Sequence, residues 1–204
     1  MITLIDYGGS NLRSVHKALE FVGASVAIAT TAGQIARAEK LILPGVGAFG
    51  AGMKALRQRD LEQAIRERAS QGVPLLGICL GMQLLFERSE EMGQHTGLGL
   101  VAGCVERFPA GGPKIPHMGW NQIEHDGSHP LLAGLPSGAY AYFVHSYFCR
   151  PAEPATIIAH AGYGQPFAAI IVQDNIYGIQ FHPEKSQQVG LTLLRNFVDM
   201  GQPT

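Results

Sequence analysis

The chain has 204 residues, of which 46% are hydrophobic and 15% are charged, and its formal net charge is −1. This length is enough for one domain with a sizeable core, and the hydrophobic fraction excludes a disordered chain. The balanced charge argues against a nucleic-acid or anionic-membrane surface, because both need clustered positive charge. We therefore expect a single soluble domain over residues 1–204.

The cysteines, the N-terminal residues and the apolar runs indicate in which cellular compartment the protein lies. Cys79, Cys104 and Cys149 form neither a CxxC pair nor an even disulfide framework, which favours a reducing environment. Residues 1–6 have no basic region, so we expect no signal peptide. The longest apolar run, residues 73–86, is too short to span a bilayer. A cytoplasmic protein is expected.

Strand and helix patterns alternate along the first half of the chain. Extended runs are predicted over residues 2–7, 26–29, 41–43 and 74–78. Apolar residues three and four positions apart predict one helix from Asn11 to Gly23 and another whose apolar stripe is Leu61, Ile65 and Ala69. Such alternation with short connections predicts a mostly parallel sheet covered by helices.

The second half contains more extended runs and fewer helices. These runs cover residues 120–123, 140–148, 156–159, 167–172 and 176–180. Asp174 and Asn175 predict a turn that joins the last two runs into a hairpin. Leu191, Leu194 and Phe197 predict a closing helix. The expected fold is α/β: a single domain with a mostly parallel central sheet flanked by helices and a more antiparallel second half.

One cysteine lies in a pattern typical of a nucleophile elbow. Residues 77–81, Gly-Ile-Cys-Leu-Gly, follow a predicted strand and open a segment expected to be helical over residues 82–87. The glycines leave room for a sharp turn that exposes the sulfur of Cys79, and the helix N-terminus behind it favours the thiolate. The N–H of Leu80 would point to where an oxyanion forms. The alternative is that Cys79 is a buried cysteine beside two packing glycines. Cys104 and Cys149 have no such setting, and we expect both to be small buried apolar residues.

A candidate base follows the last strong strand. His182 could take the proton of Cys79 and return it to a leaving amine. Glu184 lies two residues further on in an extended segment, so its carboxylate could orient the imidazole. The alternative for this His-Pro-Glu sequence is a loop with an incidental ion pair.

A glycine-rich segment follows the strand at 41–43. Gly45 and Gly47, with Val46 between them, free the backbone to turn an amide inward as a second oxyanion donor beside Leu80. Such a turn could instead hold a phosphate, as could residues 7–11, but neither has a dinucleotide or Walker fingerprint.

A metal site has little support in the sequence. His125 and His129 are four residues apart, but Gly127 and Pro130 disfavour the helix that would make this a metal-binding spacing. We expect neither a metal nor a cofactor.

Three motifs in this order resemble the class I (triad) glutamine amidotransferases: Pro-Gly-Val-Gly at 44–47, Gly-Ile-Cys-Leu-Gly-Met-Gln at 77–83 and Phe-His-Pro-Glu at 181–184. The resemblance covers essentially the whole chain, and the combination of motifs is specific. It implies a flavodoxin-like α/β domain that hydrolyses L-glutamine to glutamate and ammonia. Cys79 would be the nucleophile, His182 the acid and base, and Glu184 the residue that orients His182.

The resemblance also implies a set of binding residues. The family's oxyanion positions match Gly45, Val46, Gly47 and Leu80. Its glutamine-binding positions match Gly81, Gln83, Glu91, His145, Ser146 and Tyr147.

A further resemblance concerns a partner. Residues 6–8, 114–121 and 142–147 are similar to those of family members that pass ammonia to a separate (β/α)8-barrel cyclase subunit. The positions that face this barrel match Asn11, His117, Met118, Gly119, Trp120 and Asn121. We therefore expect a heterodimer with a cyclase, without nucleic acid or membrane partners. Ser10 stands where members commonly have glycine, which puts the local interface in doubt.

Three alternatives stay open. The first is a glutaminase of the same fold serving an anthranilate, aminodeoxychorismate or pyridoxal phosphate synthase, against which residues 116–120 argue. The second is a flavodoxin-like cysteine hydrolase or chaperone, against which the position of Glu184 argues. The third is a non-catalytic binding subunit, which the presence of all three triad residue types disfavours.

Overall fold

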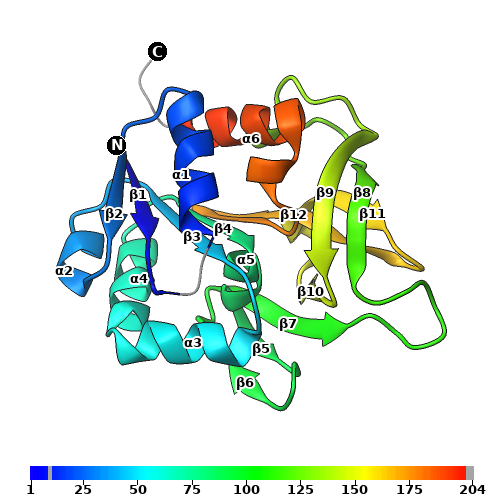
Figure 1. Ribbon diagram of the computed structural model, residues 1–204, viewed down its shortest axis with the longest axis horizontal. Coiled ribbons are helices and arrows are strands. Elements are labelled where there is room, and N and C mark those ends of the chain that lie inside the picture. The colour runs from blue at the N-terminus through cyan, green and yellow to red at the C-terminus, as the bar shows by residue number, and fades with distance from the viewer. Residues whose placement is uncertain (9–10, 201–204) are drawn as a thin grey trace.

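The computed structural model describes residues 1–8 and 11–200, so Ser10 lies outside the described residues (Figure 1). The helices are α1 (Leu12–Phe21), α2 (Ala32–Ile35), α3 (Phe49–Gln58), α4 (Leu61–Ser70), α5 (Leu80–Leu84) and α6 (Gln187–Asp199), with short 3-10 turns η1 (Pro130–Leu132), η2 (Pro154–Thr156) and η3 (Pro183–Lys185). In the described part of the chain, no helix is both long and apolar enough to cross a bilayer.

The strands form three sheets. In chain order they are β1 (Ile2–Ile5), β2 (Val26–Ala29), β3 (Leu41–Gly45), β4 (Leu75–Cys79), β5 (Phe86–Ser89), β6 (His95–Thr96), β7 (Val101–Arg107), β8 (His117–Ile123), β9 (Ala139–His145), β10 (Tyr147–Pro151), β11 (Ile157–Gly162), β12 (Pro166–Gln173) and β13 (Ile176–Ile179). The central sheet has seven strands in the order β11-β12-β13-β4-β3-β1-β2. A four-stranded sheet, β10-β7-β5-β6, and the pair β8-β9 accompany it.

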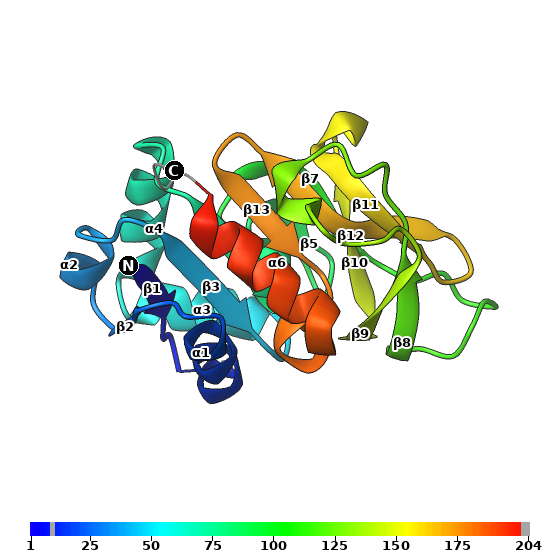
Figure 2. The same cartoon turned by 90° about the horizontal axis from the view of Figure 1, so that it is seen from above.

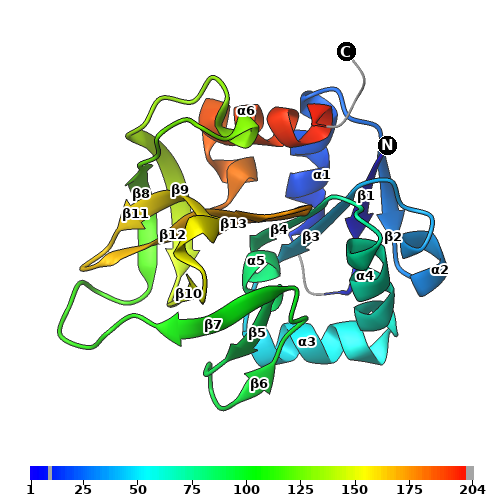
Figure 3. The ribbon, with the colours of Figure 1, turned by 180° about the vertical axis from the view of Figure 1, so that it is seen from behind.

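The central sheet is parallel from β13 to β2, and β11 and β12 continue it antiparallel. Figure 1 shows this sheet between two helical layers. Helices α1 and α6 lie side by side over one face (Figure 2), whereas α3, α4 and α5 lie on the other (Figure 3). The fold class expected from the sequence is confirmed.

The parallel strands are buried on both faces because helices cover both. Leu4 packs in the cluster that contains Leu19 of α1 and Phe197 of α6. Its neighbour Ile5 packs in the opposite cluster, with Leu56 of α3. Successive side chains of a strand point to opposite faces, so a strand covered on both faces has a continuous apolar sequence rather than an alternating one.

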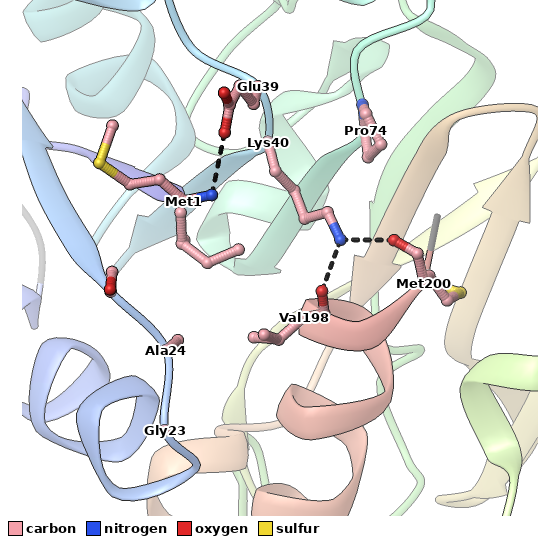
Figure 4. A pocket seen from close by; sticks show the side chains of 10 residues that line it. Met1, Gly23, Ala24, Glu39, Lys40, Pro74, Val198 and Met200 are labelled. Atoms are coloured by element: carbon pink, nitrogen blue, oxygen red, sulfur yellow. Dashed lines mark hydrogen bonds and ion pairs between the residues drawn. The ribbon is translucent and has the colours of Figure 1, made fainter. Parts of the chain in front are cut away.

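One buried cation ties the sheet to the closing helix. The Nζ of Lys40, just before β3, donates to the carbonyl oxygens of Phe197 and Val198 at 2.8 Å and of Met200 at 2.6 Å. Figure 4 shows this amine directed at the C-terminal end of α6, beside the pocket that Met1 and Pro74 also line. Burial lowers the pKa of Lys40, and the positive charge stabilises the negative end of the helix dipole.

Several sequence predictions differ from the structure. The helix expected over residues 82–87 is wrong at its end, because α5 stops at Leu84 and the chain continues as β5. The run at 140–148 is two strands, β9 and β10, separated at Ser146. Helix α3 was not expected. Cys104 is half-buried, with its thiol 3.2 Å from Glu106 Oε1, whereas Cys149 is buried as predicted.

Candidate active site

Cys79 lies at the turn from β4 into α5, in a strained backbone conformation. Its φ of 54° and ψ of −111° are rare for a residue with a side chain. A Cβ on Gly77 would lie 2.6 Å from the carbonyl oxygen of Gly81, and one on Gly81 would collide with the carbonyl oxygen of Leu43. Both glycines are therefore required for the helix to pack back against β4 and β3.

The fold brings His182 to the cysteine because β13 and β4 are parallel neighbours. Gly178 pairs with Gly77 and Ile179 with Ile78, so both strands end at the same edge of the sheet. Beyond that edge the N–H of His182 donates to the carbonyl oxygen of Tyr142 at 3.0 Å. This bond fixes the backbone of His182 against β9.

Glu184 and Asn11 orient the imidazole from behind. His182 Nδ1 lies 2.8 Å from Glu184 Oε1, and both side chains are buried. The Nδ2 of Asn11, at the start of α1, donates to the same oxygen at 3.1 Å. Asn11, which was expected at the partner interface, is thus in contact with the proposed triad.

The charge state of His182 follows from these contacts. Burial lowers its pKa, but interactions with Cys79 and Glu184 raise the pKa by more than burial lowers it, and the result is a pKa of about 10. Since Nδ1 faces the carboxylate, Nε2 has no hydrogen-bond partner within the described residues and is left for the sulfur. At neutral pH His182 is therefore an imidazolium beside Cys79.

The glycine-rich segment lies opposite the cysteine. Gly45 is the register partner of Cys79 across the β3–β4 ladder. Gly47 has a φ of +96°, a conformation for which glycine is the favoured residue, and Val46 is exposed. The structure therefore brings Val46 and Gly47 to the nucleophile.

A cavity of about 270 Å³ surrounds the sulfur. Its lining residues are Val46, Gly47, Cys79, Leu80, Gln83, Glu91, Pro116, Val144, His145, Ser146, Tyr147 and His182. Of the expected catalytic, oxyanion and glutamine-binding residues, three do not line it. Gly45 and Gly81 form the packed backbone beside the cavity, and Glu184 lies behind His182. Pro116 and Val144 are lining residues that were not expected.

Gln180 is a site residue that the sequence reasoning missed. It is fully buried, its Oε1 accepts from Gln83 Nε2 at 3.3 Å, and its Nε2 lies 4.0 Å from the sulfur of Cys79. Gln83 Nε2 also donates to the carbonyl oxygen of Tyr147 at 3.0 Å. The signal was available, because Gln180 is two residues before His182 and strand side chains alternate with that period.

His117 and His145 form a buried hydrogen-bonded chain. His145 Nδ1 lies 2.8 Å from the carbonyl oxygen of Tyr147, which only accepts, so His145 Nε2 accepts from His117 Nδ1 at 3.0 Å. His117 Nε2 in turn lies 3.3 Å from Asn121 Nδ2, a donor. Both imidazoles are therefore neutral. Burial lowers the pKa of His117 to about 4 and that of His145 to about 3.

The residues of β8 that were expected to face a partner differ in their exposure. Met118 and Trp120 on β8 have exposed fractions of 62% and 47%, so Trp120 is no core residue. Gly119 and Asn121 are half-buried. The side chain of His117 points inward instead, because alternate residues of β8 face opposite sides.

Comparisons with known proteins point to one family for this chain. Residues 3–200 match the family described as glutamine amidotransferase class-I. The imidazole glycerol phosphate synthase subunit HisH of Salinibacter ruber is 50% identical over 97% of this chain and 93% of that protein. The subunit of the same name from Moorella thermoacetica is 51% identical over 98% and 94%.

A solved structure supports the fold alone. The structure described as PurLQS from Thermotoga maritima superposes with a TM-score of 0.79 at 19% identity, over 98% of both chains. At this identity the similarity concerns the arrangement of helices and strands.

Proposed function

The chain belongs to the class I glutamine amidotransferases, and we infer that it is the glutaminase subunit of an imidazole glycerol phosphate synthase. It hydrolyses L-glutamine to glutamate and ammonia. The ammonia passes to a (β/α)8-barrel cyclase subunit, which makes imidazole glycerol phosphate and an aminoimidazole carboxamide ribotide in histidine biosynthesis. The whole of residues 1–204 serves as one glutamine amidotransferase domain, and the protein acts in the cytoplasm.

The reaction begins at Cys79. A primary amide is a poor electrophile, so attack by a thiolate divides its hydrolysis into two easier steps. The sulfur adds to the side-chain amide carbon of glutamine, and the amide oxygen becomes an oxyanion. The N–H of Leu80 and an N–H of the segment 45–47 stabilise this charge.

His182 is the acid and then the base of the reaction. With a pKa of about 10 it is protonated at neutral pH and gives its proton to the departing nitrogen, so that ammonia leaves and a thioester remains. It then accepts a proton from water as that water attacks the thioester. Glutamate leaves and Cys79 is regenerated. Glu184 holds the imidazole in the required orientation throughout.

The cavity holds the rest of the substrate. Glu91 is the carboxylate that suits the α-ammonium group of glutamine. Backbone groups of residues 145–147 and the amide of Gln83 suit its carboxylate and side-chain amide. Gly81 contributes by its lack of a side chain, which lets the elbow approach β3.

The buried Cys79–His182–Glu184 arrangement beside the cavity is the observation that carries this proposal. A chloroketone or diazoketone analogue of glutamine tests it, because such reagents alkylate a glutaminase nucleophile. Mass spectrometry is expected to find one label per chain, on Cys79 and not on Cys104 or Cys149. Burial raises the pKa of the latter two thiols, which disfavours their thiolates. Labelling that survives Cys79→Ala would contradict the assignment.

A further inference from the structure

Helix α3 begins beside the cavity without a capping side chain of its own. The residue at its N-cap position is Ala48, and its first turn contains no acidic residue. The first N–H groups of a helix have no carbonyl partner within that helix. An acceptor from elsewhere in the chain therefore stabilises this end of α3.

Glu91 provides that acceptor. Its Oε2 accepts from the N–H of Phe49 at 2.6 Å, across 42 positions of sequence. A carboxylate here combines a charge-assisted hydrogen bond with a favourable interaction with the helix dipole. The backbone N–H of Glu91 donates to Ser89 Oγ at 3.2 Å, and the Phe49 side chain is fully buried. Both partners are thus anchored.

The contact fixes one end of the proposed oxyanion segment. Gly45 is held by its pairing with Cys79, and Phe49 is held by Glu91. Only residues 46–48 lie between these two anchors, and Gly47 lacks the side chain that would restrict its backbone. Glu91 also lines the same cavity as Cys79. One carboxylate therefore lines the cavity and holds the segment that would stabilise the oxyanion.

We propose that Glu91 is a positioning residue: the α-ammonium group of glutamine bound to its carboxylate holds the Phe49 contact, and with it the oxyanion segment, in the productive arrangement. This rests on the function proposed above. A carboxylate offers about four acceptor positions, so the Phe49 bond leaves room for an ammonium group. Glu91 is half-buried, and a bound ammonium restricts its carboxylate to one orientation. Recognition of the ammonium group then increases turnover as well as affinity.

Two variants of Glu91 separate substrate binding from positioning. Glu91→Gln keeps an oxygen acceptor for the N–H of Phe49 but removes the charge, so KM for glutamine should rise about tenfold with kcat kept within about threefold. Glu91→Ala removes both functions, so kcat should also fall by about tenfold. Steady-state glutamate release is measured in the complex with the cyclase and its nucleotide. Equal kcat values for the two variants would overturn the proposal.

Glu90→Gln is the matched control. It removes a negative charge from the same turn, but Glu90 is exposed, and its Oε1 accepts from the N–H of Arg107 at 3.3 Å, away from the cavity. Both kinetic constants should stay at the wild-type values. A rise in KM equal to that of Glu91→Gln would mean a general charge effect and would also overturn the proposal.

A substrate analogue tests the coupling in the unaltered protein, even if Glu91→Ala does not fold. Glutaramate is glutamine without its α-amino group. We expect its kcat to be about fivefold or more below that of glutamine. Equal kcat with both substrates would contradict the role of Glu91 in turnover. A wild-type complex that releases no glutamate from glutamine would instead contradict the proposed function, so the two failures are distinguishable.

Discussion

At the scale of single residues, the orientation of His182 depends on a side chain that is distant in sequence. Glu184 Oε1 accepts from Asn11 Nδ2 at 3.1 Å and lies 2.8 Å from His182 Nδ1. Two partners on one carboxylate oxygen restrict the rotation of the Glu184 side chain. The start of α1 therefore contributes to the geometry of the proposed triad.

Asn11→Ala tests this contribution. We expect kcat for glutamate release to fall about three- to tenfold with KM unchanged, because one of the two donors to Glu184 is lost. Asn11→Asp should lower kcat further, since it places a second carboxylate beside the first. Arg13→Ala, an exposed change on the same helix, is the control. Wild-type kcat in Asn11→Ala, measured with saturating cyclase, would contradict the role of Asn11.

Gly81 is a second residue with a specific physical requirement. An added methyl group would collide with the Leu43 carbonyl oxygen, and that backbone is part of β3. Gly81→Ala should lower the free energy of unfolding by about 2–4 kcal/mol and abolish glutaminase activity. Urea denaturation measures the first effect. Gly33→Ala, at an open helical position, should leave stability unchanged or raise it slightly. Equal stabilities of the two variants would be inconsistent with the packing described.

At the scale of elements, β8 and β9 carry an uncharged histidine pair. Burial holds the pKa of His117 at about 4 and that of His145 at about 3, against ordinary values near 6.5. The unfolded chain binds protons at these two sites that the folded chain does not bind. The pair therefore contributes stability that is fully present above pH 6.5 and is lost as the pH falls towards 3.

His117→Phe measures this effect and keeps the aromatic contacts with Phe143 and Tyr163. Between pH 6 and 4 the unfolding free energy of the wild-type chain should fall more steeply than that of the variant. The difference should approach about 1.4 kcal/mol per pH unit, the value for one proton. Denaturant titrations at several pH values provide the two slopes. Parallel slopes would show that His117 protonates equally in both states.

The elements differ in how well the sequence predicts them. The buried strands and α1 have clear periodicity, and the Asp174–Asn175 turn joins β12 to β13 as predicted. The run from Leu84 to Phe86 does not distinguish helix from strand, because it is apolar throughout. Pairing of β5 with β7 decides it, and that contact is set by the tertiary structure. The start of α3 could not be predicted for a related reason. Its capping acceptor is Glu91, which is distant in sequence, and so the sequence near Phe49 contains no capping signal.

At the scale of the whole molecule, the exposed side chains of Met118 and Trp120 do not line the active-site cavity, but their register partners on β9 connect them to it. Met118 pairs with Val144, which lines the cavity, and Trp120 pairs with Tyr142, whose carbonyl oxygen accepts from the N–H of His182. Met118 and Trp120 extend from one face of β8, on which the next residue, Gln122, is also exposed. A large exposed aromatic side chain of this kind is typical of a residue that anchors a partner.

Trp120→Ala should therefore weaken binding of the cyclase about tenfold or more, with labelling of the isolated chain by a glutamine analogue unchanged. Isothermal calorimetry measures the affinity. Phe21→Ala, which removes an exposed aromatic ring at the far end of α1, is the control and should have no effect. Cyclase affinity that is equal for the wild-type chain and Trp120→Ala would rule out β8 as the docking strand.

The sequence predicts the components of the site better than their connections. Cys79, His182 and Glu184 could be named because each lies in a short motif with a local physical reason. The contact of Asn11 with Glu184 and the inward position of His117 could not, because they depend on partners more than 25 positions away in sequence. Such contacts follow from the order of strands in the sheet and not from local patterns.

The measurement that tests the function most directly is glutamate release from glutamine, with and without the cyclase subunit and its nucleotide ligand. A glutaminase that works without an ammonia acceptor wastes glutamine. We therefore expect its activity to be coupled to the partner, with low glutamate release by the isolated chain and strong release in the complex. Cys79→Ala should abolish release under both conditions. Equal rates with and without the partner would contradict the coupling, and no release in the complex would contradict the assignment itself.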